Sequence, residues 1–129
     1  MALATAPDSR DVSLTIPAKP DYLVLARLAL AAVCRLTPLS PEEVADLKLA
    51  VTEAAADFVD ERAADTEEAR VSFSFRLEEK RLVLVLEGNH SETAPVEQEL
   101  GRAIIDATVD ECDFAPGRTR LVKQLQPSS

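Results

Sequence analysis

The positions of apolar and polar residues along the chain predict five strands. They are residues 11–16, 71–77, 82–86, 110–114 and 119–125. The first two alternate between apolar and polar side chains, as expected of strands with one face exposed to water. The third is an unbroken run of Leu and Val, which is typical of a strand covered on both faces or at the centre of a sheet.

Three further segments have the composition or the spacing of helices, at residues 22–35, 41–61 and 96–109. The first is apolar nearly all round and is therefore expected to be well buried. The second follows Ser40-Pro41-Glu42-Glu43, a capping box with proline at the first helical position. The third places four apolar residues on one side of the helix, namely Leu100, Ala103, Ile104 and Ala107.

The resulting order of elements is β-α-α-β-β-α-β-β. Hairpins on both sides of the third helix imply a mostly antiparallel sheet, so the fold class is α+β, a two-layer sandwich with about three helices on one face. We expect residues 1–10 to be a flexible tail, residues 11–126 to form a single domain, and residues 127–129 to be a frayed end.

Composition narrows the class of partner. The chain has 129 residues, with 23 Asp and Glu against 14 Lys and Arg, which gives a net charge of −9. This charge repels nucleic acid and anionic membranes, and it favours basic partners. The first ten residues lack the pattern of a signal peptide, and the two cysteines do not form a metal motif, so we expect a cytoplasmic protein with reduced thiols.

Three segments, read together, carry a family resemblance. Residues 47–62, LKLAVTEAAADFVDER, resemble the first nucleotide-binding helix of the GHKL (Bergerat-fold) ATPases, and in particular of the anti-sigma-factor serine kinases of the RsbW type. The preceding strand, its Pro-x-x-Pro exit and the capped helix resemble the start of the same domain. Residues 101–125, GRAIIDATVDECDFAPGRTRLVKQL, resemble its final helix and hairpin, so that the resemblance covers roughly residues 12–125.

The resemblance assigns two acidic residues to catalysis. Glu53 occupies the position of the family's general base, and Asp57 occupies that of the Asn that holds Mg²⁺. At a spacing of i and i+4 the two share one helix face. A carboxylate at position 57 is a hard oxygen ligand for Mg²⁺, but it also places a negative charge beside the phosphates. Composition alone favours a solvated helix face for these acids.

The family's nucleotide motifs are eroded. Its adenine-binding Asp-x-Gly-x-Gly falls at residues 86–90, where Leu86 replaces the Asp, Glu87 is one residue off and faces the other side of the strand, and Gly88 remains. The glycine-rich lid is reduced to Gly101. Thr119 matches the strand Thr near the adenine. We therefore expect the binding of ATP and Mg²⁺ to be weak or lost.

Three functions follow from the resemblance. The first is a regulatory protein that binds a sigma factor and/or an anti-sigma-factor antagonist with a STAS domain, and that uses the first helix and strand for a homodimer and a sigma-factor surface. The alternative is an active Mg-ATP-dependent serine/threonine protein kinase that phosphorylates the antagonist. The third is a GHKL-like domain with another regulatory partner, or one that only dimerises. The erosion of three motifs together favours the first.

Overall fold

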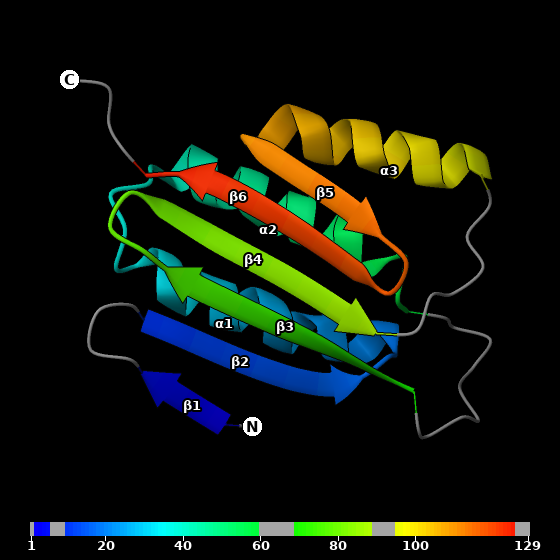
Figure 1. Ribbon diagram of the computed structural model, residues 1–129, viewed down its shortest axis with the longest axis horizontal. Helices are drawn as coiled ribbons and strands as arrows, with labels where there is room; N and C mark the ends of the chain where they lie inside the picture. Colours follow the sequence, from blue (N-terminus) through cyan, green and yellow to red (C-terminus); the bar gives the residue numbers. More distant parts are fainter. Residues whose placement is uncertain (1, 6–9, 60–68, 89–94, 126–129) are drawn as a thin grey trace.

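The computed structural model describes residues 2–5, 10–59, 69–88 and 95–125, and these form one antiparallel sheet with helices on one face (Figure 1). The sheet has six strands in the order β1-β2-β3-β4-β6-β5. The strands are β1 (Ala2–Thr5), β2 (Arg10–Pro17), β3 (Arg70–Leu77), β4 (Arg81–Gly88), β5 (Glu111–Ala115) and β6 (Arg118–Gln124). The predicted α+β class is confirmed.

Three α-helices form the second layer: α1 (Leu23–Cys34), α2 (Pro41–Ala55) and α3 (Pro95–Thr108), with a short 3₁₀ turn, η1 (Pro20–Tyr22), before α1. They cover one face of the sheet, and the other face is open (Figure 1). α1 lies behind the β2–β3 side of the sheet, whereas α3 lies beside the β5 edge (Figure 1). None of the helices in the described part of the chain is long and apolar enough to cross a membrane.

The strand β4 lies at the centre of the sheet, between β3 and β6, as its run of Leu and Val predicts. Leu82, Leu84 and Leu86 point toward the helices and are completely buried, and Val83 on the open face is only 8% exposed. They pack against Val71, Phe73 and Phe75 of β3 and the inner sides of α1 and α2 to form the core. Burial of each such side chain contributes about 1.5–3 kcal/mol.

The N-terminal segment differs from the expected tail. Ala2–Thr5 pairs with β2 as an antiparallel edge strand, from Ala2 opposite Ser13 to Thr5 opposite Arg10. A four-residue strand offers too few positions for an alternating pattern to be recognised, and its pairing depends on the backbone of β2. Residues 1, 6–9 and 127–129, which belong to the predicted tail and frayed end, lie outside the described residues.

The helix α2 ends at Ala55 rather than at residue 61. The next amides bond to the carbonyl three residues back: Asp57 N–H to Ala54 at 3.3 Å and Phe58 N–H to Ala55 at 2.9 Å. Such bonds tighten the last turn and satisfy the carbonyls at the end of a helix. Phe58 is thereby turned into the core, where it is 2% exposed.

Two helices expose apolar residues that the pattern places inside. In α1, Val24, Leu25 and Leu28 are 49%, 43% and 62% exposed, so this helix is not buried all round. In α3, the residues that face α2 are Gly101 and Ile105. Four residues were predicted to form its apolar side. Of these, Leu100, Ala103 and Ala107 are exposed, and Ile104 is half-buried.

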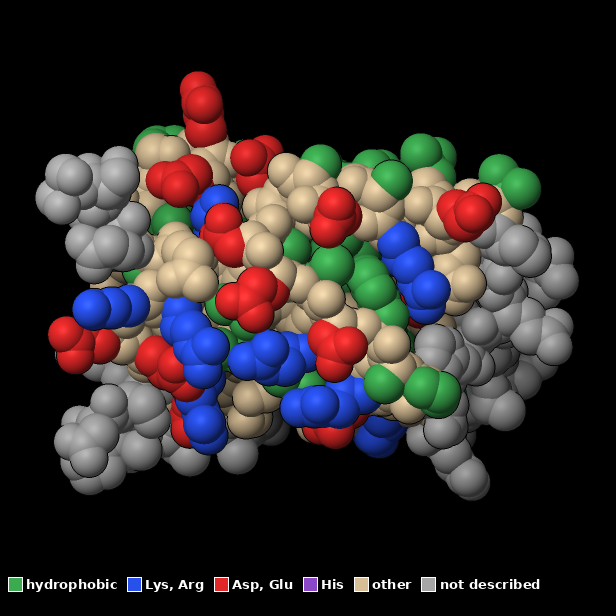
Figure 2. All heavy atoms as spheres, turned by 45° about the horizontal axis from the view of Figure 1, so that its top comes forward, with side chains coloured by type: hydrophobic (Ala, Val, Ile, Leu, Met, Phe, Trp, Pro, Cys, Tyr) green, Lys and Arg blue, Asp and Glu red, His purple; other side chains and the backbone are tan. Residues whose placement is uncertain are grey.

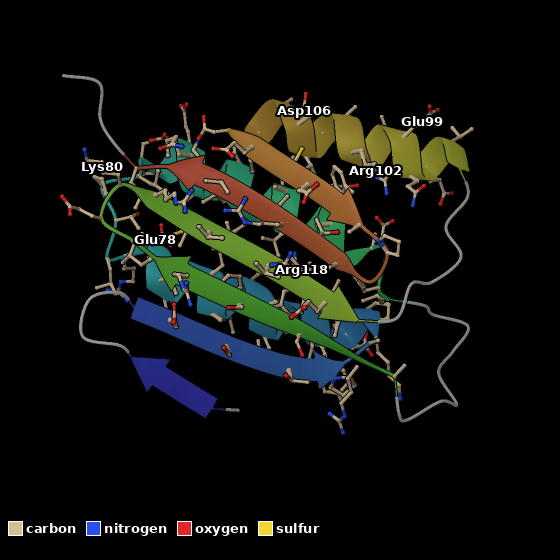
Figure 3. All side chains as sticks on the ribbon, in the orientation of Figure 1. Glu78, Lys80, Glu99, Arg102, Asp106 and Arg118 are labelled. Carbon is tan, nitrogen blue, oxygen red and sulfur yellow. The ribbon has the colours of Figure 1, made fainter. Side chains whose placement is uncertain are left out.

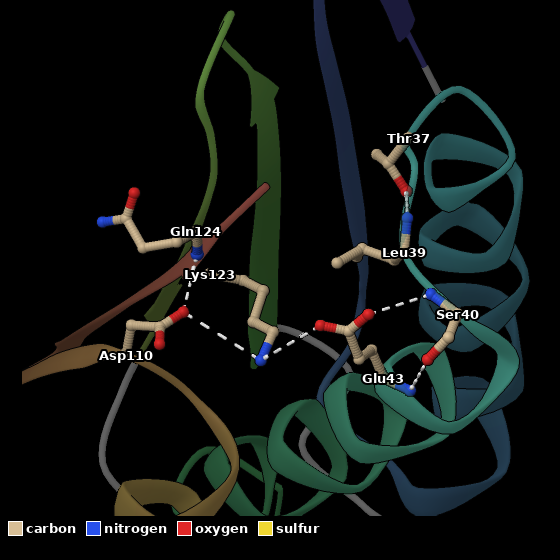
Figure 4. A network of polar contacts seen from close by, with 7 residues as sticks. All are labelled: Thr37, Leu39, Ser40, Glu43, Asp110, Lys123 and Gln124. Atoms are coloured by element: carbon tan, nitrogen blue, oxygen red, sulfur yellow. Dashed lines mark hydrogen bonds and ion pairs between the residues drawn. The ribbon is translucent and has the colours of Figure 1, made fainter. Parts of the chain in front are cut away.

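Polar contacts hold the start of α2 against the end of the sheet where β5 begins and β6 ends (Figure 4). The Ser40 Oγ accepts from the N–H of Glu43 at 3.1 Å, and the N–H of Ser40 donates to Glu43 Oε1 at 3.0 Å, which completes the predicted capping box. Lys123 Nζ lies 3.9 Å from Glu43 and 4.0 Å from Asp110, whose carboxylate accepts from the N–H of Gln124 at 2.6 Å. The backbone bond from Ser40 holds the pKa of the Glu43 carboxyl below its usual value.

Replacing Ser40 by alanine tests the cap. Ser40→Ala leaves the N–H of Glu43 without its side-chain acceptor, so we expect the free energy of unfolding to fall by about 1 kcal/mol. Urea unfolding followed by circular dichroism measures this change. Ser13→Ala, an exposed serine in β2, is the matched control and should stay within about 0.5 kcal/mol of wild type. Equal effects of the two substitutions would contradict the role of the cap.

Candidate functional site

A cavity of about 270 Å³ lies between the end of α2 and the inner side of α3. It brings together three of the residues singled out in the sequence, Glu53, Asp57 and Gly101. The other residues that line it are Ala56, Glu97, Gln98, Leu100, Arg102 and Ile105. The cavity therefore occupies the place that the family resemblance gives to the triphosphate.

Glu53 lies in the last turn of α2, with its carboxylate directed at α3. Gly101 faces it from the second turn of α3, and not from a loop. A Cβ atom at position 101 would lie 3.3 Å from Glu53 Oε1. The absence of a side chain at Gly101 therefore lets the two helices approach each other, which is a packing role and differs from that of a glycine-rich lid.

Asp57 follows the end of α2 and is only 6% exposed. It lines the same cavity as Glu53 although the helix ends before it. Burial of a carboxylate is costly unless other groups satisfy it, so Asp57 does not belong to a solvated helix face. Asp60 and Glu61, which would extend that face, lie outside the described residues.

The position that the family resemblance gives to the adenine-binding Asp is part of the core. Leu86 lies directly opposite Thr119 in the β4–β6 pair, and the two side chains are 0% and 2% exposed. Glu87 points to the open face of the sheet, where its carboxylate lies 3.7 Å from Arg118 Nε. The neighbouring acid is thus on the wrong side of the sheet to replace a carboxylate at position 86, because adjacent residues of a strand face opposite sides.

Gly88 ends β4 where three segments meet. Its N–H donates to the carbonyl of Gly117 at 3.1 Å. A Cβ atom at position 88 would lie 2.9 Å from the carbonyl oxygen of Arg70 and 3.4 Å from the ring of Phe58. Gly117 itself has a φ of +75°, a conformation that favours glycine in the β5–β6 turn. Both glycines are thus required by the fold itself.

The charge around the cavity is mainly negative. Among the described residues, three carboxylates line it, those of Glu53, Asp57 and Glu97, together with one cation, that of Arg102. The Arg102 guanidinium lies 4.5 Å from the centre of the Phe114 ring, between α3 and β5 (Figure 3). Its Nε is buried and has no hydrogen-bond partner within the described part of the chain. Glu97, Arg102 and Phe114 were not predicted, since nothing in their spacing points to a shared site.

These residues fit ATP poorly. A triphosphate needs cations and backbone donors, whereas the part of the cavity lining that the structure describes offers one arginine and three carboxylates. Among the described residues, no group of three or more His, Cys, Asp or Glu side chains is arranged to hold a metal ion. At position 86, where the resemblance expects the Asp that accepts a hydrogen bond from the amino group of the base, the chain has Leu86.

Comparison with known proteins bears out the resemblance. The histidine kinase-like ATPase domain family matches residues 16–124. Among curated proteins, "Serine-protein kinase RsbW" of Oceanobacillus iheyensis is 30% identical over 70% of this chain and 58% of its own length. The proteins of the same name from Bacillus subtilis and Bacillus pumilus are 30% and 32% identical, over 78% of this chain and 64% of their own lengths. The chain thus spans about three-fifths of these relatives.

Alanine at Gly88 and at Gly101 tests how closely the chain packs at each of these positions. Gly88→Ala would press a methyl group against the backbone carbonyl of Arg70, so we expect a loss of about 1–3 kcal/mol in the free energy of unfolding. Gly101→Ala meets the end of the flexible Glu53 side chain and should cost less. Thermal and urea unfolding of both variants measure the difference, and a larger loss for Gly101→Ala would contradict this description of the site.

Proposed function

Because the chain belongs to the histidine kinase-like ATPase family, within its RsbW-type group, we propose that it is a regulatory protein of the anti-sigma-factor kind. In this proposal it binds a sigma factor and exchanges it for an anti-sigma-factor antagonist with a STAS domain, and its binding of ATP and Mg²⁺ is weak or lost. The observation that carries the proposal is the burial of Leu86 against Thr119 at the adenine position.

The proposed weakness of ATP binding has one cause at the base and another at the phosphates. Loss of one specific hydrogen bond to the base costs about 1–3 kcal/mol, or roughly tenfold to a hundredfold in affinity. Glu53, Asp57 and Glu97 add repulsion toward a triphosphate in the adjoining cavity. Binding of a protein partner requires neither of these contacts, which is why we favour a binding function.

An exposed apolar surface supports a protein partner. We call it the α1 patch; it consists of Tyr22, Val24, Leu25 and Leu28, which are 41–62% exposed. Next to it, a hollow of about 530 Å³ lies between α1 and β2 and is lined mainly by apolar residues. Such surfaces mark interaction sites in soluble proteins. We propose that the α1 patch binds the sigma factor and contributes to a homodimer.

An active kinase is the second candidate, because Glu53 and Asp57 line one cavity. In that function the Glu53 carboxylate would accept the proton of the attacking serine or threonine hydroxyl of the antagonist, and Asp57 would hold Mg²⁺. Transfer of labelled phosphate from Mg-ATP to the antagonist, abolished in Glu53→Gln, would establish this alternative.

Pull-down with each sigma factor of the source organism tests the binding function. We expect one sigma factor to bind without added nucleotide, and Leu28→Ser to weaken it about tenfold or more, because this substitution removes an apolar anchor from the α1 patch. Leu49→Ser, which changes a leucine 43% exposed on α2, is the matched control. The proposal would be wrong if no sigma factor bound or if the two substitutions had the same effect.

A further inference from the structure

The helix α3 has two apolar faces, and the fold uses only one of them. Toward α2 it presents Gly101 and Ile105, which are buried. On its outer side it presents a row that we call the outer seam of α3, and one member of this row, Leu100, also lines the cavity between α2 and α3. The outer seam consists of Val96, Leu100, Ala103 and Ala107. Val96 and Leu100 are 75% and 62% exposed, so they are among the most exposed large apolar residues in the described part of the chain.

The spacing of the outer seam is that of a helix-pairing surface. Successive members are four, three and four residues apart, which matches the d, a, d and a positions of consecutive heptads. In this register Ile105, the residue most deeply buried, takes position f, directly opposite the seam. Figure 2 shows hydrophobic side chains interspersed with acidic ones along the edge of the molecule that α3 forms.

The charges that flank the outer seam have one sign. Glu97 takes an e position, and Glu99 and Asp106 take g positions, which are the places that face a partner helix. The one cation of α3, Arg102, is turned toward the sheet, where it stacks on Phe114 (Figure 3). The outer side of α3 therefore combines an apolar stripe with borders on which every charge is acidic, while the remaining flanking position, an e position, holds the half-buried Ile104.

We propose that the outer seam of α3 binds an amphipathic helix of a partner protein that carries apolar residues at its own a and d positions and Lys or Arg at its e and g positions. Basic flanks complement Glu97, Glu99 and Asp106. A second copy of α3 would place acidic flanks against acidic flanks, which disfavours self-pairing. An anionic lipid surface is disfavoured by the same charges.

This surface is separate from the α1 patch. α1 lies behind the β2–β3 side of the sheet, and α3 lies beside the β5 edge (Figure 1). The proposal therefore holds whether or not α1 binds a sigma factor. It gives the protein a second docking surface, through which one partner could bind while the α1 patch holds another.

Two synthetic helical peptides test the proposal on the full chain. Both carry Leu at the a and d positions; one carries Lys at e and g, and the other carries Glu there. Fluorescence anisotropy should detect binding of the Lys peptide and not of the Glu peptide. Leu100→Ser should weaken the binding of the Lys peptide about tenfold. Leu28→Ser is the matched control, since Leu28 and Leu100 are both 62% exposed, and it should leave the affinity unchanged.

A charge reversal gives a second variant that does not touch the packing of α3. Glu99→Lys should weaken the binding of the Lys peptide and strengthen the binding of the Glu peptide. Equal affinities in wild type and Leu100→Ser, or equal losses in Leu100→Ser and Leu28→Ser, would overturn the proposal, because they would indicate general attraction to an acidic protein. Self-association of the wild type that Leu100→Ser abolishes in sedimentation experiments would also overturn it, in favour of a second copy.

Discussion

The contact between Leu86 and Thr119 at the centre of the sheet is the constraint on which the rest of the site depends. These residues face each other across β4 and β6 and are buried beneath the helices. A carboxylate at position 86, where the family resemblance expects the adenine-binding Asp, would have to be buried among Leu and Val side chains at considerable cost. The packing that stabilises the sheet therefore favours Leu86 at this position, and in our proposal this residue removes one specific contact with a nucleotide.

The three glycines of the chain also have roles in the fold that do not depend on a nucleotide. Their scarcity argues against a glycine-rich phosphate loop, and the structure gives each of them a role in packing or in a turn. Gly88 lies against the backbone of β3, Gly101 lies against Glu53 of α2, and Gly117 adopts the positive φ of the last hairpin. Gly88 and Gly101, the two glycines that the family resemblance connects to nucleotide binding, thus each have a role in the close packing of the chain.

Much of this fold could be predicted from local pattern, because each central strand carries its own signal. Val71, Phe73 and Phe75 alternate with polar residues, and Ser40 with Glu43 forms a capping box that the structure contains. The orientation of α3 could not be predicted, because its apolar residues are compatible with two faces. Only the contact with α2 decides that Ile105 points inward and Leu100 outward. Glu97 was missed for a related reason, since only tertiary packing brings it to the cavity that Glu53 and Asp57 line.

Calorimetric titration with Mg-ATP tests most directly whether the domain has lost its binding of ATP. We expect no measurable heat of binding at micromolar concentrations of protein. The folding of the titrated sample is verified by circular dichroism. A micromolar dissociation constant corresponds to about −8 kcal/mol of binding free energy. Such an affinity in wild type would contradict this proposal and would show that the domain retains a working nucleotide site.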